Sequence, residues 1–250
     1  MDDLPRAGSG IVGVLNETVP VPGWETVAVT GVFAAAVSMA TFVSMLTDSR
    51  KLLRLANVLG TIFHEGGHAF VAVLTGGGVY RIRVTDADSG WTLHWAPSRL
   101  SRIFTGAAGY AMPPLAGLAA AALLHRGYAP AVLALTIAAM ALVLLVTRDL
   151  LTLAVVLGVA GVAFAALRWG EGPLQNSLAY AESWLLLTSE IGGLAAIIGN
   201  RIRNGYRGHG DDAEVLAEHT PIPAFAWIAS WFALIGWALW RATPLLWPAS

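Results

Sequence analysis

Two histidines and a glutamate in one short segment are the residues of this chain best suited to chemistry. His64 and His68 stand four positions apart, and Glu65 directly follows the first of them. Residues four apart lie on one face of a helix, so the two imidazoles would point at the same metal ion. Zinc accepts imidazole ligands, and a glutamate beside them can take a proton from a zinc-bound water as that water attacks a carbonyl. The spacing therefore predicts zinc at His64 and His68, with Glu65 as the general base.

The composition indicates that this motif lies in a membrane protein. The chain has 250 residues, of which 56% are hydrophobic and 12% are charged, whereas soluble domains carry roughly 25% charged residues. Most of its surface must therefore face the lipid bilayer. The absence of cysteine excludes disulfides and thiolate ligands, so any metal must be held by nitrogen and oxygen atoms. A net charge of -1 gives no sign of nucleic-acid binding.

Seven apolar runs come close to the length of about 20 residues that a helix needs to cross a membrane. These runs lie at 26–47, 52–75, 103–124, 129–147, 150–168, 176–198 and 223–241. We expect an all-α integral membrane bundle of six or seven transmembrane helices, forming one domain over residues 1–250. Asp2, Asp3 and Glu17 precede the first run, unlike in a secretory signal, so we expect a retained helix behind an N-terminal tail at 1–25. The basic residues of the loops leave the orientation in the membrane open.

Two segments are too polar to cross a membrane. Residues 79–95 alternate apolar and polar side chains around an Asp/Ser/Gly turn, which predicts a short β-hairpin at the membrane surface, after the motif helix. We expect one polar face and one apolar face, the latter formed by Tyr80, Ile82, Val84, Trp91, Leu93 and Trp95. The hairpin could bind an extended substrate by adding a strand, or could only cover the helix ends. Residues 199–221 are predicted to form a polar loop.

The motif also has a structural interpretation, in which His64 and His68 are core residues and Glu65 is their partner. Two observations favour a functional role instead. A charged group costs at least about 2.5–3.5 kcal/mol at the centre of a bilayer, so acids inside membrane helices are rare. Gly66 and Gly67 each weaken a helix by roughly 1 kcal/mol relative to alanine, and packing alone is not an obvious reason for both. Small residues do let helices or a substrate backbone come close.

Several segments resemble the site-2 protease family of intramembrane zinc metalloproteases, in particular its bacterial branch of small multi-pass peptidase-like proteins. They are His-Glu-Gly-Gly-His-Ala at 64–69, Leu-Thr-Gly-Gly at 74–77, Ala-Gly-Tyr at 108–110, Trp-Leu-Leu-Leu at 184–187 and Asp-Ala-Glu-Val-Leu-Ala at 212–217. Site-2 proteases also carry a membrane-surface β-ribbon at the place of the predicted hairpin. The resemblance implies hydrolysis of peptide bonds in or near the membrane, with Zn2+ as the cofactor and a membrane protein or peptide as the substrate.

The third zinc ligand is the open question, because a catalytic zinc site needs three protein ligands. Well-studied site-2 proteases take it from the aspartate of a Leu-Asp-Gly motif, which this chain lacks. Asp212, in a segment that matches the bacterial branch, is the first candidate, and Asp149 and Glu182 are the next. Asp212 could instead cap a helix, and Asp149 could pair with Arg148. Glu190, before two glycines, could mark only the end of a helix.

The remaining residues near the motif are given supporting roles. Three small residues are expected to serve close helix packing: Ala108, Gly109 and Gly117. Three histidines in polar segments are expected to be exposed: His94, His209 and His219.

The expected function is that of an intramembrane zinc metalloendopeptidase, multi-pass in the bacterial inner membrane, which cleaves membrane proteins in regulated proteolysis. This expectation follows from the resemblance, together with the chemistry of the motif. The alternative is a metal-binding membrane protein without peptidase activity, such as a transporter or an inactive protease homologue.

Overall fold

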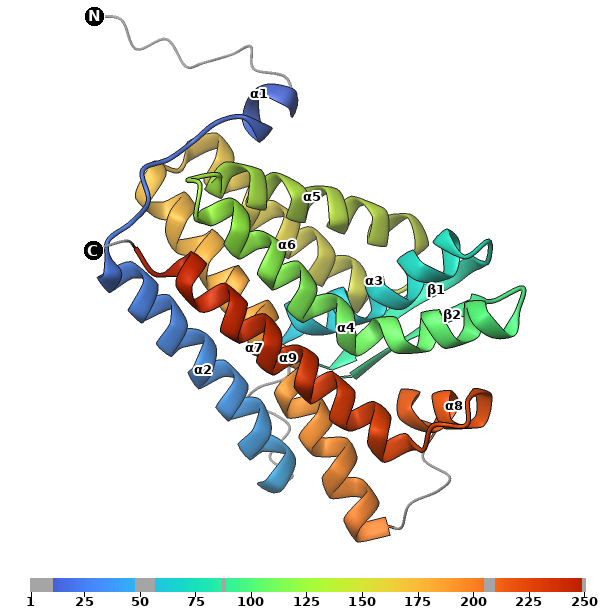
Figure 1. The fold of residues 1–250 in the computed structure, drawn as a ribbon. Coiled ribbons are helices and arrows are strands. Elements are labelled where there is room, and N and C mark those ends of the chain that lie inside the picture. Colours follow the sequence, from blue (N-terminus) through green and yellow to red (C-terminus); the bar gives the residue numbers. More distant parts are fainter. Residues whose placement is uncertain (1–10, 48–56, 87–88, 205–209, 249–250) are drawn as a thin grey trace, which may run out of the picture.

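The computed structural model describes residues 11–47, 57–86, 89–204 and 210–248 of the chain (Figure 1). The helices and strands along these residues are α1 (Ile11–Leu15), α2 (Trp24–Thr47), α3 (Val58–Leu74), β1 (Gly78–Asp86), β2 (Ser89–Trp95), α4 (Arg99–Leu124), α5 (Ala129–Val146), α6 (Leu150–Trp169), α7 (Gly172–Asn204), α8 (Asp212–His219) and α9 (Ala224–Leu246). Parts of the predicted N-terminal tail, second span, hairpin turn and polar loop lie outside the described residues, at 1–10, 48–56, 87–88 and 205–209.

Each of the seven predicted spans corresponds to a long helix, namely α2 to α7 and α9. Within the described residues, five of these helices are long and apolar enough to cross a membrane: α4, α5, α6, α7 and α9. The apolar runs of α2 and α3, Trp24–Ala40 and Val58–Leu74, are shorter. Large apolar side chains stay exposed on the outside, such as Leu145 at 69% and Leu150 at 83%, as expected where the surrounding solvent is lipid. The predicted all-α membrane bundle is confirmed, and the chain is a multi-pass membrane protein.

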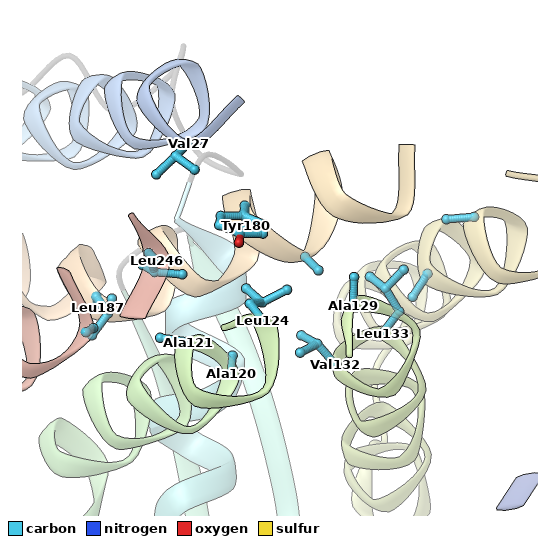
Figure 2. Packing of buried hydrophobic residues seen from close by; sticks show 14 of the residues in the cluster. Val27, Ala120, Ala121, Leu124, Ala129, Val132, Leu133, Tyr180, Leu187 and Leu246 are labelled. Atoms are coloured by element: carbon cyan, nitrogen blue, oxygen red, sulfur yellow. The ribbon is translucent and has the colours of Figure 1, made fainter. Parts of the chain in front are cut away.

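A tightly packed core joins the helices at the C-terminal end of α4 (Figure 2). Leu124 of α4, Leu133 of α5 and Tyr180 of α7 are at most 2% exposed there. Val27 of α2 and Leu246 of α9, both 0% exposed, complete its centre. Lipid tails are as apolar as leucine, so close packing rather than exclusion of water holds such helices together. This apolar core holds the helices together at one end of the bundle. The polar residues of the motif lie away from it.

Glycines let α3, α4 and α7 approach one another closely. A Cβ atom on Gly67 would lie 2.6 Å from the Met112 Cβ, and one on Gly117 would lie 2.9 Å from the Leu187 Cγ. Both distances are shorter than side-chain atoms tolerate, so the packing of α3 on α4 and of α4 on α7 requires glycine at these positions. A Cβ on Gly66 would meet only one side-chain atom, at an ordinary 3.8 Å. Of the two motif glycines, only Gly67 is required by packing.

Strands β1 and β2 pair antiparallel into the predicted hairpin, but the predicted division into a polar and an apolar face is wrong. Ile82 pairs with Thr92, and Arg83 pairs with Trp91. Paired residues point to the same side of a sheet, so this register joins the apolar positions of one strand to the polar positions of the other. The inner face holds Ile82, Val84, Gly90, Thr92 and His94, and the outer face holds Arg81, Arg83, Trp91, Leu93 and Trp95. Polar side chains of β2 can therefore face the motif helix.

The described part of the polar segment 199–221 is largely helical instead of forming a loop. Helix α7 continues into it as far as Asn204, and its 33 residues make it about 50 Å long, well beyond the hydrocarbon core of about 30 Å. Residues 212–219 form α8, which lies beside the N-terminal half of α4 (Figure 1). The Asp211 carboxylate caps α8 by accepting a hydrogen bond from the Glu214 amide at 3.0 Å. The polar composition here reflects helices outside the membrane core.

Candidate metal centre

His64 and His68 on α3 and Asp212 on α8 converge on one point. The Nε2 atoms of the two imidazoles are 3.2 Å apart. The Asp212 Oδ2 lies 3.3 Å from the Nε2 of His64 and 3.2 Å from that of His68. Within the part of the chain that the structure describes, no other trio of such donor atoms lies this close together. The structure thus brings the two predicted histidines together with the first candidate for the third ligand.

Each imidazole is held in place through its other nitrogen. The His68 Nδ1 lies 2.7 Å from the Thr105 carbonyl oxygen on α4. A carbonyl only accepts, so this Nδ1 carries the proton and the Nε2 keeps its lone pair for a metal. The His64 Nδ1 donates to the Glu190 Oε2 on α7 at 3.1 Å, a carboxylate–histidine pair of the kind that orients metal ligands. The interpretation of Glu190 as a helix end is wrong, because α7 continues past it to Asn204.

The three donor atoms suit a tetrahedral zinc ion. Zinc–ligand bonds of about 2.0–2.2 Å in a tetrahedron place the ligand atoms about 3.3–3.6 Å from one another. The observed separations of 3.2–3.3 Å lie at the short end of this range. Two imidazole lone pairs and a carboxylate oxygen at such distances repel one another unless a positive charge lies between them. The donor set therefore fits a divalent cation that takes nitrogen and oxygen ligands.

Helix α4 forms the wall behind the two imidazoles. A Cβ atom on Gly109 would lie 2.6 Å from the His64 Nε2, and the His68 Nε2 would be closer still. The Tyr110 ring stands edge-on to His64, with ring centroids 4.5 Å apart at 89°, and it packs on Trp231 of α9 at 4.7 Å. Gly109 thus lets α4 pack closely on α3, as expected, and the side chains for which it makes room are those of the two imidazoles.

Asp212 is the first residue of α8, directly after the N-cap Asp211. The helix cap is therefore Asp211, and its neighbour Asp212 stays the candidate ligand. Burial alone would raise the pKa of the Asp212 carboxyl. When no metal is bound and the imidazoles are protonated, the charge of His68 and hydrogen bonds with both imidazoles hold this pKa well below its usual range. Asp212 is thus an anionic donor at neutral pH, with a side chain that is 25% exposed.

Glu65 lies under the hairpin, and β2 fixes its position. Its Oε2 accepts a hydrogen bond from the Thr92 hydroxyl at 2.7 Å, and the same hydroxyl lies 3.0 Å from the Glu65 backbone oxygen. A Cβ atom on Gly90 would lie 2.8 Å from the Glu65 Cγ, so glycine lets β2 run directly over this side chain. Sequence reasoning missed Thr92, because alternation within one strand does not show which face of the hairpin lies against the motif helix.

A cavity of about 680 Å3 opens between α3, α4, α7, α8 and β2. Its lining includes the three donors, Glu65 and Thr92. His94 of β2 also lines it, half-buried rather than exposed as predicted, with its ring parallel to that of His68 at a centroid distance of 6.5 Å. Cavities of about 300–1,000 Å3 are typical of binding sites. The three candidate donors and Glu65 thus line a cavity of a size typical of binding sites.

The other candidate ligands lie elsewhere. Asp149 caps α6 by accepting from the Thr152 amide at 3.0 Å, while Arg148 donates to backbone carbonyls. Glu182 is buried, 8% exposed, and accepts a hydrogen bond from Thr136 of α5. Neither acid lines the cavity, so Asp212 is the one candidate of the three that the fold brings to the histidines.

A membrane bundle with a His-His-Asp cluster and an adjacent buried glutamate defines a multi-pass membrane protein with a candidate metal centre. The chain belongs to the Peptidase M50B-like family, whose model matches residues 15–242. This match confirms the predicted relationship to the site-2 proteases, and it places the chain in a family of membrane peptidases. Comparison with curated proteins and with solved structures gives no match.

Proposed function

We propose that the protein is an intramembrane zinc metallopeptidase that hydrolyses peptide bonds of membrane proteins in the bacterial cell membrane. The observation that carries this proposal is the trio of donor atoms 3.2–3.3 Å apart on α3 and α8, with Glu65 directly after the first ligand. Membership of a membrane peptidase family supports it. A role in regulated proteolysis would follow if the cleaved substrates include signalling proteins.

The chain's own residues divide the work of the proposed reaction. His64, His68 and Asp212 would hold the metal. When bound, zinc lowers the pKa of a coordinated water towards neutrality and polarises a substrate carbonyl. Glu65 accepts the proton of the attacking water and delivers it to the leaving amine. Thr92 keeps the Glu65 carboxylate fixed by its hydrogen bond to Oε2, so the base needs little reorganisation during the reaction.

The free edge of β2 is the proposed binding place for the substrate backbone. The outer edge of β1 is partly occupied, because Ile82 bridges to Thr147 and the Val84 amide donates to Thr152 at 2.9 Å. Among the described residues, the sheet has only two strands, so the outer edge of β2 has no strand partner. An extended segment added there would run along the cavity. A substrate helix must unwind to pair in this way, since its backbone groups are otherwise bonded to one another.

Replacement of the proposed base tests this function. Membranes of cells that make the wild type or Glu65→Gln are compared by mass spectrometry of protein N-termini, and the purified proteins by metal analysis. We expect new N-termini in or beside membrane segments only with the wild type, and bound zinc in both proteins. Glu182→Gln, which changes another buried glutamate, is the matched control and should keep cleavage.

Two results would contradict the proposal in different ways. Cleavage that persists in Glu65→Gln would exclude this residue as the base. Bound zinc without any cleavage by the wild type would favour the alternative of a metal-binding protein without peptidase activity.

A further inference from the structure

The third candidate donor lies on a much shorter helix than the other two. Asp212 begins α8, which has 8 residues and packs on the long helices α4 and α9, whereas α3 has 17 residues (Figure 1). The C-terminal half of α8 is fastened by Leu216, which is 0% exposed, and by Arg99, whose Nε donates to the His219 carbonyl at 2.8 Å. At the opposite end, Ala213 is also buried, at 0% exposed. The position of the neighbouring Asp212 carboxylate depends in addition on what holds the N-cap Asp211.

Arg201, near the C-terminus of α7, holds that end. Its Nη2 lies 2.5 Å and 2.6 Å from the two carboxylate oxygens of Asp211, the N-cap of α8. Arg201 is 6% exposed, so the ion pair is largely shielded from water. The same Asp211 Oδ1 accepts from the Glu214 amide at 3.0 Å. The guanidinium, the cap carboxylate and the first turn of α8 thus form one continuous chain of charge-assisted hydrogen bonds.

We propose that Arg201 is a positioning residue of the metal centre, which holds Asp211 and thereby keeps Asp212 within reach of the two imidazoles. This inference rests on the zinc site proposed above. Helix α7 then supports the centre twice, because Glu190 on the same helix holds His64 at 3.1 Å. Arg201 and Glu190 are about three turns apart, or roughly 16 Å along the axis. One continuous helix therefore positions a ligand of α3 and a ligand of α8 relative to each other.

Loss of the guanidinium should displace the third ligand. Without the Arg201 guanidinium, the Asp211 carboxylate would keep its negative charge in a place largely shielded from water. Such a charge without its ion-pair partner is energetically unfavourable. A shift of the α8 N-terminus towards water relieves this, but it carries Asp212 along. Zinc sites tolerate deviations of only about 0.2 Å in their bond lengths. We expect the zinc affinity to fall about 10- to 100-fold, as is typical when a residue that orients a ligand is lost.

The test measures zinc affinity of the full-length protein in detergent by competition with a chelator. Arg201→Met should bind zinc about 10- to 100-fold more weakly than the wild type, and Arg201→Lys should restore part of this loss because it keeps the charge. Arg241→Met is the matched control, since Arg241 is an exposed arginine that packs on the Trp240 ring. Its zinc affinity should equal that of the wild type.

The possible outcomes separate this inference from the proposed function. Absence of zinc from the wild type would refute the proposed function itself. Zinc bound by the wild type and equally tightly by Arg201→Met would refute only the positioning role, even if the zinc-free variant unfolds at a lower temperature. If Arg201→Met does not fold, the zinc affinity of Asp211→Asn is the deciding measurement, because asparagine keeps the capping oxygen and removes the charge. Unchanged zinc affinity in that variant would equally overturn the inference.

Discussion

The variant Gly109→Ala should abolish tight zinc binding although it replaces none of the three proposed zinc ligands. The added methyl group would lie 2.6 Å from the His64 Nε2 and even closer to the His68 Nε2. Ordinary contacts of a Cβ atom begin at 3.4 Å. Both imidazoles would therefore have to retreat, the His64 Nε2 by about 0.8 Å and the His68 Nε2, which would lie at 2.4 Å, by about 1.0 Å. These shifts are roughly four to five times the deviation of about 0.2 Å that is acceptable in zinc–ligand distances.

The size of the expected loss in zinc affinity follows from this displacement of the imidazoles. The imidazoles cannot give way freely, because the His64 Nδ1 is bonded to Glu190 and the His68 Nδ1 to Thr105. Either a hydrogen bond breaks or a metal bond is lost. Loss of a single orienting residue costs about 10- to 100-fold in zinc affinity, so we expect a loss of at least about 100-fold when both nitrogens are displaced.

Chelator competition on the purified protein measures this loss, and thermal unfolding of the zinc-free protein shows whether the variant folds. Gly158→Ala is the matched control, because a Cβ atom there meets nothing within 4 Å. A folded Gly109→Ala protein with the zinc affinity of the wild type would refute the placement of both imidazoles against α4.

Three further variants test other contacts of the centre. Thr92→Val should lower kcat about 10- to 100-fold and leave the zinc content unchanged, because it removes the hydroxyl that fixes the Glu65 carboxylate. Thr92→Ser keeps a hydroxyl and should restore the rate. An unchanged kcat in the valine variant would exclude a role of this hydrogen bond in catalysis. Asp212→Asn should weaken zinc binding, measured by chelator competition, whereas Asp149→Asn should not, because asparagine still caps α6; equal affinities would exclude Asp212 as a ligand. Gly67→Ala should lower the free energy of unfolding by about 1–3 kcal/mol through overpacking against α4, while Gly66→Ala should not. Chemical denaturation compares the two variants. A larger loss of stability in Gly66→Ala than in Gly67→Ala would contradict the packing of α3 on α4.

Features set by local sequence could be predicted. The apolar runs are long enough to specify the spans, and the four-residue spacing of His64 and His68 specifies a shared helix face. The Asp/Ser/Gly turn likewise located the hairpin. These patterns depend only on the periodicity of one element, so no knowledge of its neighbours is needed.

Features that depend on contacts between elements could not be predicted with the same certainty. Alternation shows which residues of one strand share a face, but not that Thr92 lies opposite Ile82 and above Glu65. Glu190 precedes two glycines, which suggested a helix end, yet these glycines lie inside a helix that packs against Tyr110. Arg201 sits in a polar stretch without any recognisable pattern, and its partner Asp211 is brought to it only by the tertiary fold.

X-ray absorption at the zinc edge of the purified wild-type protein tests the metal centre most directly. We predict about one zinc ion per chain, with two imidazole nitrogens and at least one oxygen at about 2.0–2.2 Å, and a loss of bound zinc in Asp212→Asn. Protein that carries no zinc, or zinc without imidazole ligands, while His64 and His68 are intact would contradict the proposed site.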